Sequence, residues 1–390
     1  MTDNIDDRPQ IEVTNSAITA RWLRDQLGTG ELSGIFRREA ELVHTPMISQ
    51  DGYIPAEKLG LKDAGPAQVR PISDKQVKAV IDARYLVWRM VIRGHGEKRQ
   101  EVQQLCLFPP QACTSAYEAA RIGESTPNVR DLHGITHTPT IRPEGSILDI
   151  PGYDEQTRML YLPDEGLEDL DVPDDPTNAD KINARNLILT PLKEFPFVCE
   201  DDRATYIGLM LTPTLRPLFP PPYQMGVLTA TNPGSGKTLL AEMLKDVHGG
   251  VLRGEIPRED AELRKAITAT LIDTTAPVAV FDNLAGVVKS PVLDSLLTAS
   301  EWTDRYLGHS RSVTVKNDRL WIATGNNAQF GGDLGRRITT VRLAPPTAEH
   351  FKRTDFQIND LRMWMHEHRA EYLTAILTLA RGWINAGRPQ

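Results

Sequence analysis

The sequence predicts an α/β fold in the second half of the chain, with a central parallel sheet flanked by helices, after a smaller mixed α+β N-terminal domain. Three apolar runs carry this prediction: residues 225–230, 277–281 and 320–324. Each run is followed at once by polar or glycine-rich residues, as is typical of buried strands whose carboxyl ends reach one edge of a sheet. After the first run, apolar residues recur at helical spacing until Gly249, so a helix follows that strand.

The remaining elements follow from periodicity and turn residues. Helices are expected at residues 15–26, 73–83, 110–121, 178–188, 203–211 and 360–386, and further strands at 85–92 and 338–343. Between residues 135 and 162, apolar runs alternate with turn signals rich in proline and glycine, which indicates small β-hairpins. We expect two domains: residues 1–193, with an acidic linker at about 154–180, and residues 194–390, whose last helix packs on the core or covers a ligand.

The composition is that of a soluble globular protein, since 40% of the 390 residues are hydrophobic and 25% are charged. The net charge of −8 is unevenly distributed: residues 151–205 hold 14 acidic and 5 basic side chains, but residues 206–390 hold 18 acidic and 21 basic ones. The acidic total therefore does not exclude nucleic acid as a partner. There is no apolar run of membrane-spanning length, the N-terminus is not signal-like, and three cysteines without metal-ligand spacing fit a reducing cytoplasm.

The segment 231–238, Thr-Asn-Pro-Gly-Ser-Gly-Lys-Thr, lies between the first strand and its helix and has the pattern of a phosphate-binding loop, with Thr231 where the first glycine is usual. Its glycines allow backbone N–H groups to turn inward around a polyphosphate, which also meets the positive end of the helix dipole. Lys237 would reach the β- and γ-phosphates, and the Thr238 hydroxyl would hold Mg²⁺. The residues expected to bind a nucleoside triphosphate are Asn232, Pro233, Gly234, Ser235, Gly236, Lys237 and Thr238.

Polar side chains also follow the other strands. Asp282 ends the second run and would bind Mg²⁺ through water, although a cap or turn role is the ordinary one for such a residue. Asn326 follows the third run; its amide could orient an attacking water, or it could form a turn with Asn327. Arg336 and Arg337 precede the next strand and are either surface charges or arginine fingers that reach the γ-phosphate of a neighbouring subunit.

Other polar clusters fit simpler roles. Asp169 and Asp171 could be a metal-binding pair, but no second carboxylate motif follows on a strand, so a solvated linker is favoured. His133 and His137 lack further ligands nearby, and the two histidines of segment 366–368 point to different faces of a helix. None of these clusters predicts a zinc site.

The order of phosphate loop, acidic strand, polar strand and arginines resembles that of AAA+ ATPases, and within them superfamily 3 replicative helicases. The segment 281–284, Phe-Asp-Asn-Leu, is similar to the acidic second motif of that family, and the segment 323–326 to its Thr-x-Asn sensor. These motifs cover residues 225–343. More loosely, the chain from about residue 130 resembles the ATPase half of primase–helicase proteins from phages and integrated elements.

This resemblance implies a ring, expected to be a hexamer, that is driven by ATP and Mg²⁺ and translocates on single-stranded or forked DNA, with a primase or an origin as further partners. The segment 303–316 lies where members of the family place a DNA-gripping hairpin. The basic residues expected to contact DNA there are Arg305, Arg311, Lys316 and Arg319. The alternative is an exposed ribbon whose charges serve solubility.

One position departs from the family pattern: Asn283 stands where a second acidic residue is usual. A carboxylate can accept a proton from the attacking water, whereas a carboxamide can only orient it. Hydrolysis is therefore expected to be slow or to use another carboxylate, for which Asp294 and Glu301 are nearby in sequence.

Two functional classes follow. The first is an ATP-dependent DNA helicase or translocase of phage or mobile-element replication, with Lys237, Asp282, Asn283, Asn326 and an arginine as catalytic residues. The second, favoured by Asn283, is a nucleotide-gated DNA-binding protein or helicase loader with little or no unwinding. GTPases and small-molecule kinases are disfavoured, because the segment 315–318 has a GTPase base-recognition motif in the wrong order and a kinase needs no trailing arginines. The first 130 residues predict no function.

Overall fold

The computed structural model describes residues 8–29, 32, 34–38, 41–45, 48–49, 52–53, 70–123, 129–284, 286–305, 312–346 and 353–389. Contacts between residues divide the chain into two compact units, Met1–His133 and Gly134–Gln390. This division lies earlier in the chain than the boundary expected at residues 193–194. The reason is that the segment after the division packs within the second unit, where Ile141 and Ile147 are buried with Leu377 of the last helix.

The acidic segment at residues 154–180, expected as a linker, also lies inside the second unit. Two of its carboxylates pair with arginines of the last helix: Asp164 lies 2.8 Å from Arg369, and Asp174 lies 2.9 Å from Arg381. These pairs neutralise part of the acidic run and tie it to the helix. The segment is therefore a packed part of the second unit.

The first unit is a mixed α+β structure. Its helices are α1 (Ser16–Thr29), α2 (Asp74–Arg84) and α3 (Pro110–Ile122). Its strands are β1 (Gln10–Glu12), β2 (Ile35–Arg38), β3 (Glu41–His44), β4 (Ile48–Ser49), β5 (Gly52–Tyr53), β6 (Arg70–Pro71), β7 (Leu86–Arg93) and β8 (Gln100–Leu105). β1 runs parallel to β7, and β7 forms a long antiparallel hairpin with β8. A second sheet contains β2, β3 and β6, and β4 pairs with β5.

Local sequence explains why the helices of the first unit form where they do. α2 begins at a capping box, in which Ser73 and Gln76 each satisfy a backbone N–H group of the other. α3 ends at Gly123, whose φ of 80° lies in the left-handed region that glycine adopts without strain. All three helices bury apolar residues in one core, where the ring of Trp22 packs edge-on against that of Tyr85.

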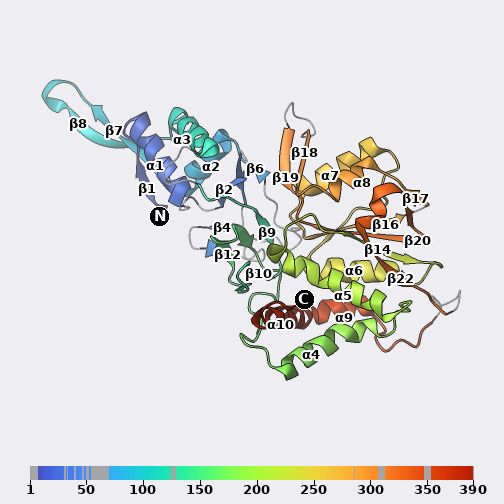
Figure 1. Cartoon of the computed structure of the whole chain (residues 1–390). Coiled ribbons are helices and arrows are strands. Elements are labelled where there is room, and N and C mark those ends of the chain that lie inside the picture. The colour runs from blue at the N-terminus through green and yellow to red at the C-terminus, as the bar shows by residue number, and fades with distance from the viewer. Residues whose placement is uncertain are drawn as a thin grey trace. The chain divides into compact units, whose positions relative to one another are not determined.

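A five-stranded parallel sheet forms the centre of the second unit, as the sequence predicted (Figure 1). In spatial order its strands are β15 (Val251–Leu252), β16 (Val278–Leu284), β20 (Leu320–Asn326), β14 (Met225–Ala230) and β22 (Ile338–Leu343). All neighbouring pairs are parallel, so the carboxyl ends of the strands share one edge. β20 lies between β14 and β16, which makes the three strand ends singled out in the sequence direct neighbours.

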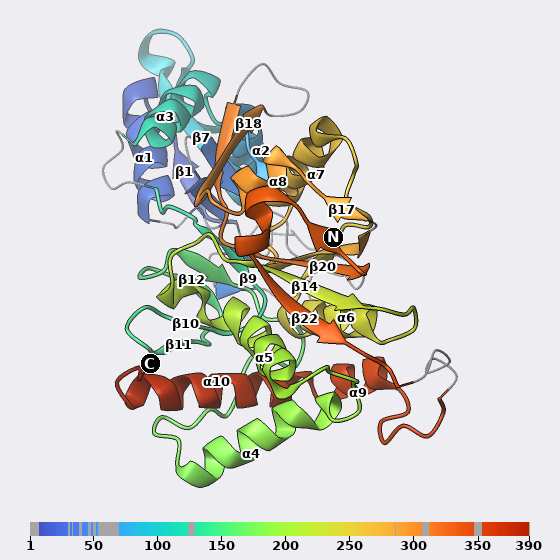
Figure 2. The same ribbon diagram turned by 45° about the vertical axis from the view of Figure 1, so that its right-hand side comes forward.

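Helices cover both faces of this sheet (Figure 2), because successive side chains of each strand point to opposite faces. In β16, Val278 and Val280 belong to one core cluster, whereas Ala279 and Phe281 belong to another. The helices of the first cluster are α4 (Asn178–Leu189), α5 (Glu200–Leu215), α6 (Lys237–His248), α9 (Leu361–Glu367) and α10 (Arg369–Asn385). Those of the second cluster are α7 (Asp260–Asp273) and α8 (Pro291–Leu296).

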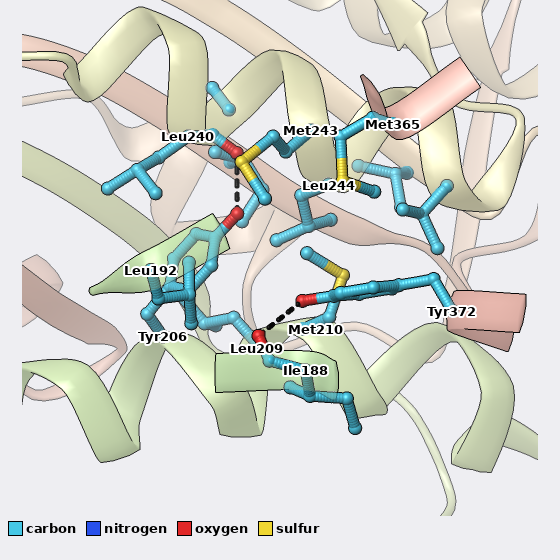
Figure 3. Packing of buried hydrophobic residues seen from close by; sticks show 14 of the residues in the cluster. Ile188, Leu192, Tyr206, Leu209, Met210, Leu240, Met243, Leu244, Met365 and Tyr372 are labelled. Atoms are coloured by element: carbon cyan, nitrogen blue, oxygen red, sulfur yellow. Dashed lines mark hydrogen bonds between the residues drawn. The ribbon is translucent and has the colours of Figure 1, made fainter. Parts of the chain in front are cut away.

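Two buried tyrosines form hydrogen bonds between helices of the core cluster that contains α6 (Figure 3). The hydroxyl of Tyr206 on α5 donates to the carbonyl of Leu240 on α6 at 2.8 Å. The hydroxyl of Tyr372 on α10 donates to the carbonyl of Ile188 on α4 at 3.0 Å. Burial raises the pKa of both phenols, so they stay neutral donors. The first bond joins α6, which follows the phosphate-loop segment, to α5, and the second joins α10 to α4.

Short strands complete the second unit. They are β9 (Gly134–Thr136), β10 (Thr140–Ile141), β11 (Ile147–Leu148), β12 (Gly152–Asp154), β13 (Met159–Tyr161), β17 (Val287–Val288), β18 (Glu301–Arg305), β19 (Ser312–Lys316) and β21 (Gln329–Phe330). The pairs β10–β11 and β12–β13 are the small hairpins that the sequence predicted. The single helix expected at 360–386 is instead two, α9 and α10, because His368 leaves the helical conformation with ψ near 12°.

Candidate functional site

The phosphate-loop segment joins the carboxyl end of β14 to α6, in the strand–loop–helix context that its pattern requires. Gly234 and Gly236 have φ values of 70° and 89°, in the left-handed region. A side chain at Gly236 would also collide with Phe195, since its Cβ would lie 2.8 Å from the ring. No side chain caps the first turn of α6, so its N–H groups are open to an anion.

Two side chains of the loop favour a ligand with negative charge. Lys237 is 8% exposed, and this burial lowers the pKa of its ammonium group, an effect that the carboxylate of Asp282 only partly offsets. The Ser235 hydroxyl is buried and has no hydrogen-bond partner among the described residues. A bound polyphosphate would supply partners for both groups. Asn232 is half-buried, whereas Pro233 and Gly234 are exposed at the loop surface.

Thr238 and Asp282, the two residues expected to hold a metal ion, are brought together from α6 and β16. The Thr238 hydroxyl lies 3.3 Å from Oδ1 of Asp282, which also accepts a hydrogen bond from Thr324 on β20. The two oxygens lie close enough for one Mg²⁺ to be held by the Thr238 hydroxyl directly and by Asp282 through a bound water. Among the described residues, no group of three or more His, Cys, Asp or Glu side chains is arranged to hold a metal.

Asp282 and Asn283 lie in a β-bulge, because the pairing of β16 with β20 shifts register between Phe281 and Leu284. The bulge gives Asn283 a φ of 62°, a left-handed conformation that Asn tolerates better than most residues. Its backbone N–H donates to the Thr324 hydroxyl at 3.1 Å. The backbone therefore gives a physical reason for Asn at this position.

Asn326 ends β20 and pairs with Ala230, the last residue of β14 before the loop. Its side-chain oxygen is buried and has no hydrogen-bond partner among the described residues. The next residue, Asn327, turns the chain with a φ of 49° and donates its N–H to the Ala230 carbonyl at 3.1 Å. Asn327 thus fills the turn role considered for the asparagines, and the Asn326 side-chain oxygen remains able to accept a hydrogen bond.

A cavity of about 760 Å³ adjoins the loop, a size that suits a small organic ligand. Its walls come from the start of α6, from the segment before α5 and from the segment leading into α9. Its lining includes Thr190, Phe195, Pro196, Phe356 and Asp360. Glu194 joins two of these walls, since it pairs with Arg353 and accepts the backbone N–H of Gln357 at 2.6 Å.

The two arginines expected to be arginine fingers differ in their exposure and in their partners. Arg337 is mostly buried and donates to Oδ1 of Asp294 at 2.7 Å and to the Asp294 carbonyl at 2.9 Å. Arg336 is 69% exposed and lies 3.1 Å from Asp333. Both precede β22, whose first residue pairs with Met225, so they lie at the amino edge of the sheet. The length of β14, about 17 Å, separates them from the loop of the same chain.

β18 and β19 form the antiparallel hairpin expected near residues 303–316. Its base is fixed to α7: Trp302 donates from its indole to Thr268 at 2.9 Å, and Arg264 lies over the Trp302 ring. Arg305 and Lys316 are exposed on this hairpin. Arg311 falls outside the described residues.

The DNA role expected for Arg319 is contradicted. Its side chain is 3% exposed, and its guanidinium donates to the carbonyls of Thr270 and Leu271 at 2.5 and 3.0 Å and to that of Thr274. These groups end α7, so Arg319 caps that helix and complements the negative end of its dipole. In the sequence, Arg319 is a basic residue directly before a buried strand. Nothing in that pattern distinguishes a DNA contact from a helix cap.

One nearby carboxylate was not singled out in the sequence, and two others were suggested there. Glu255, in the segment after β15, accepts a hydrogen bond from the Asn283 amide at 2.9 Å, although 28 residues separate them. Asp294, suggested as a replacement carboxylate, is occupied by Arg337. Glu301, the other suggestion, lies on β18 opposite Lys316. The only signal for Glu255 was its place after a short strand next to β16.

Comparisons with known proteins give weak structural similarities. No family model and no curated protein matches this chain. The A-form apo structure of the NrS-1 C-terminal region is 12% identical, with 65% of this chain and 56% of that chain covered and a TM-score of 0.38. A second structure of the NrS-1 C-terminal region is 19% identical, with 53% and 47% covered and a TM-score of 0.32. The JCV helicase is 16% identical, with 53% and 61% covered and a TM-score of 0.29.

This chain thus spans about half of the NrS-1 regions, 56% and 47% of their lengths. At these TM-scores the three similarities assign neither a family nor an activity. None of the described helices combines the length and apolar character needed to cross a membrane.

Proposed function

We propose that this protein is a Mg²⁺-dependent ATPase that acts on DNA as a helicase or translocase. One observation carries the proposal: β14, β20 and β16 are neighbours, and their carboxyl ends lead to the loop before Lys237, to Asn326 and to Asp282 at one edge of the sheet. The order of these motifs resembles that of superfamily 3 helicases, which favours a motor over other phosphate-binding proteins.

ATP binding uses the loop and the adjoining cavity. The triphosphate lies against the N–H groups at the start of α6, and Lys237 regains a charge partner there. The base and ribose occupy the cavity beside Phe195 and Phe356, whose rings provide apolar walls. Thr238 and Asp282 hold Mg²⁺, which when bound neutralises charge on the phosphates.

Hydrolysis requires a positioned water and a cation beside the γ-phosphate. The unpartnered Asn326 oxygen accepts a hydrogen bond from that water and orients it. The exposed Arg336, at the amino edge of the sheet, serves the site of a neighbouring subunit, since it lies too far from the loop of its own chain. Such a cross-subunit site requires a head-to-tail assembly of subunits, for which we propose a hexameric ring.

The β18–β19 hairpin is the proposed DNA contact. Arg305 and Lys316 lie on this two-stranded ribbon with exposed side chains and can pair with backbone phosphates. Trp302 bonds to α7 and is buried in the same core cluster as Phe281 and Trp321 of the central sheet, so the hairpin packs on the sheet that carries the proposed ATP site.

Two assays test the proposal. ATP turnover is measured with and without single-stranded DNA, and strand displacement is measured on a forked duplex with ATP. DNA-stimulated turnover together with displacement supports a helicase. An oligomeric protein that shows no turnover in either condition would refute the ATPase.

A second function is favoured by Asn283, whose carboxamide cannot accept a proton from water. In that case the protein is a nucleotide-gated DNA-binding protein or loader, and ATP mainly closes the ring. ATP-dependent binding of DNA without displacement of a forked duplex would favour this function. Particle images with a non-hydrolysable ATP analogue and single-stranded DNA would show the ring in either case.

A further inference from the structure

We propose that Glu255 is the general base of ATP hydrolysis, in place of the carboxylate that Asn283 lacks; this inference rests on the proposed ATPase function. The side-chain amide of Asn283 donates to Oε1 of Glu255 at 2.9 Å. The pair therefore places a carboxylate directly beside the position where a carboxamide cannot serve as a base.

The backbone fixes this placement. β15 pairs with β16 in parallel, and the ladder continues beyond β15, where Arg253 donates its N–H to Val280 and Asp282 donates its N–H to the Gly254 carbonyl at 2.8 Å. Gly254 then turns the chain with a φ of 72°. Glu255 follows immediately, so the register of the sheet, rather than side-chain flexibility, brings it to Asn283.

Hydrogen bonds also connect Glu255 to the metal-binding residues. Asn283 donates its backbone N–H to Thr324, and Thr324 donates its hydroxyl to Asp282, which lies 3.3 Å from Thr238. The carboxylate is thus held at one end of a continuous network whose other end is the start of α6. A base so placed is oriented toward the same edge of the sheet as the loop and Asn326.

Glu255 has the properties that a base requires. Its side chain is exposed, so water reaches it, and its second oxygen has no hydrogen-bond partner among the described residues. The Asn283 amide occupies only the first oxygen and holds it in place. The other two carboxylates near in sequence are less suited, because Asp294 is paired with Arg337 and Glu301 lies on the β18–β19 hairpin.

The proposed step conserves atoms and charge. Glu255 accepts a proton from the water that Asn326 orients, while the water oxygen bonds to the γ-phosphorus. The bond from that phosphorus to the β–γ bridging oxygen breaks, and the electron pair leaves with ADP. Inorganic phosphate is released, and Glu255 then returns its proton to solvent.

The test uses the Glu255→Gln variant of the full chain, which keeps an acceptor for the Asn283 amide but cannot accept a proton. We expect at least a 100-fold fall in ATP turnover, the range of general-base catalysis. The affinity for a fluorescent, non-hydrolysable ATP analogue with Mg²⁺ should stay within threefold of wild type. Chromatography of the nucleotide retained after incubation with ATP should find ATP on the variant and ADP on wild type.

The matched control is Glu259→Gln, four residues further along the same segment; its side chain is also exposed, and turnover should be unchanged. A fall of less than tenfold in Glu255→Gln, or an equal loss of nucleotide affinity, would overturn the role of Glu255 alone. A wild-type protein that binds the analogue but does not hydrolyse ATP would overturn the proposed ATPase, and the base with it.

Discussion

The hydroxyl of Thr238 lies 3.3 Å from the carboxylate of Asp282, although 44 residues separate them in the chain. Thr238 is in the first turn of α6 and Asp282 is in the bulge of β16, so the parallel sheet brings them to one edge. This proximity fits a shared Mg²⁺ that Thr238 would bind directly and Asp282 through water. The pair also receives a hydrogen bond from Thr324, which links the third strand to the same point.

The first prediction concerns this pair. Asp282→Asn keeps the shape of the side chain but removes its charge, so it should weaken binding of an ATP analogue at least tenfold when Mg²⁺ is present. Without Mg²⁺ the affinity should change less than threefold. Titrations of a fluorescent analogue with and without Mg²⁺ measure both values, and an equal effect in the two conditions would argue against a metal at Asp282.

The second prediction separates Lys316 from Arg319. Lys316 is exposed, so Lys316→Ala should weaken binding to single-stranded DNA and reduce the slope of log affinity against log salt by about 0.7, the value for one phosphate contact. Arg319 caps α7, so Arg319→Ala should lower the free energy of unfolding by about 3 kcal/mol. At a temperature where both variants are folded, a change in salt slope for Arg319→Ala alone would reverse these roles.

The third prediction concerns the arginines. Arg336 is exposed, so Arg336→Ala should leave the free energy of unfolding within about 0.5 kcal/mol but reduce ATP turnover about 1000-fold. Arg337 bonds Asp294 within its own chain, so Arg337→Ala should cost about 2 kcal/mol of stability. Urea unfolding and turnover measurements distinguish the two effects.

Mixing inactive variants tests whether the site spans two subunits. Lys237→Ala and Arg336→Ala should each be inactive, but co-assembled rings contain some boundaries with an intact loop facing an intact arginine. Turnover should therefore reappear on mixing. Its complete absence in rings shown to contain both variants would place Arg336 outside the site.

The fourth prediction concerns pH. His248 ends α6 and is fully buried, with Nε2 2.8 Å from the Met210 carbonyl. Burial lowers its pKa from 6.5 to about 3, and the nearby Arg369 and Arg216 act in the same direction. The unfolded chain therefore binds a proton that the folded chain does not, and stability falls as pH drops through 6.5 toward 3.

Between pH 6.5 and 5.5 this residue should cost the wild type about 1 kcal/mol of unfolding free energy. His248→Gln keeps an amide donor for Met210 and removes the titration. The variant should lose about 1 kcal/mol less than wild type over this interval in urea titrations. Parallel losses in the two proteins would show that His248 is not the group responsible.

The central sheet was predictable because three apolar runs end in polar residues, and the structure has strands β14, β16 and β20 at these runs. The phosphate loop was predictable because its spacing is local. The hydrogen bond between Glu255 and Asn283 was not predictable, because it depends on the β15–β16 register and β15 is only two residues long. The break at His368 likewise has no proline or glycine to signal it.

The C-terminal end of α7 shows a second kind of contact that the sequence does not predict. Four basic residues between 305 and 319 look alike in the sequence, yet Arg319 is buried while Arg305 and Lys316 are exposed. Burial of an arginine depends on unpaired carbonyls brought from Thr270 and Leu271, far from it in the chain. The composition of a segment does not predict such a contact. A basic residue that caps a distant helix is therefore easily mistaken for a surface charge.

The most direct test of the account is calorimetric titration of the oligomeric protein with ATP and Mg²⁺, with Lys237→Ala as its partner variant. Wild type should show saturable binding followed by release of phosphate, and Lys237→Ala should lose binding or turnover. Wild-type protein that binds no nucleotide at saturating ATP and Mg²⁺ would contradict the proposed ATPase function.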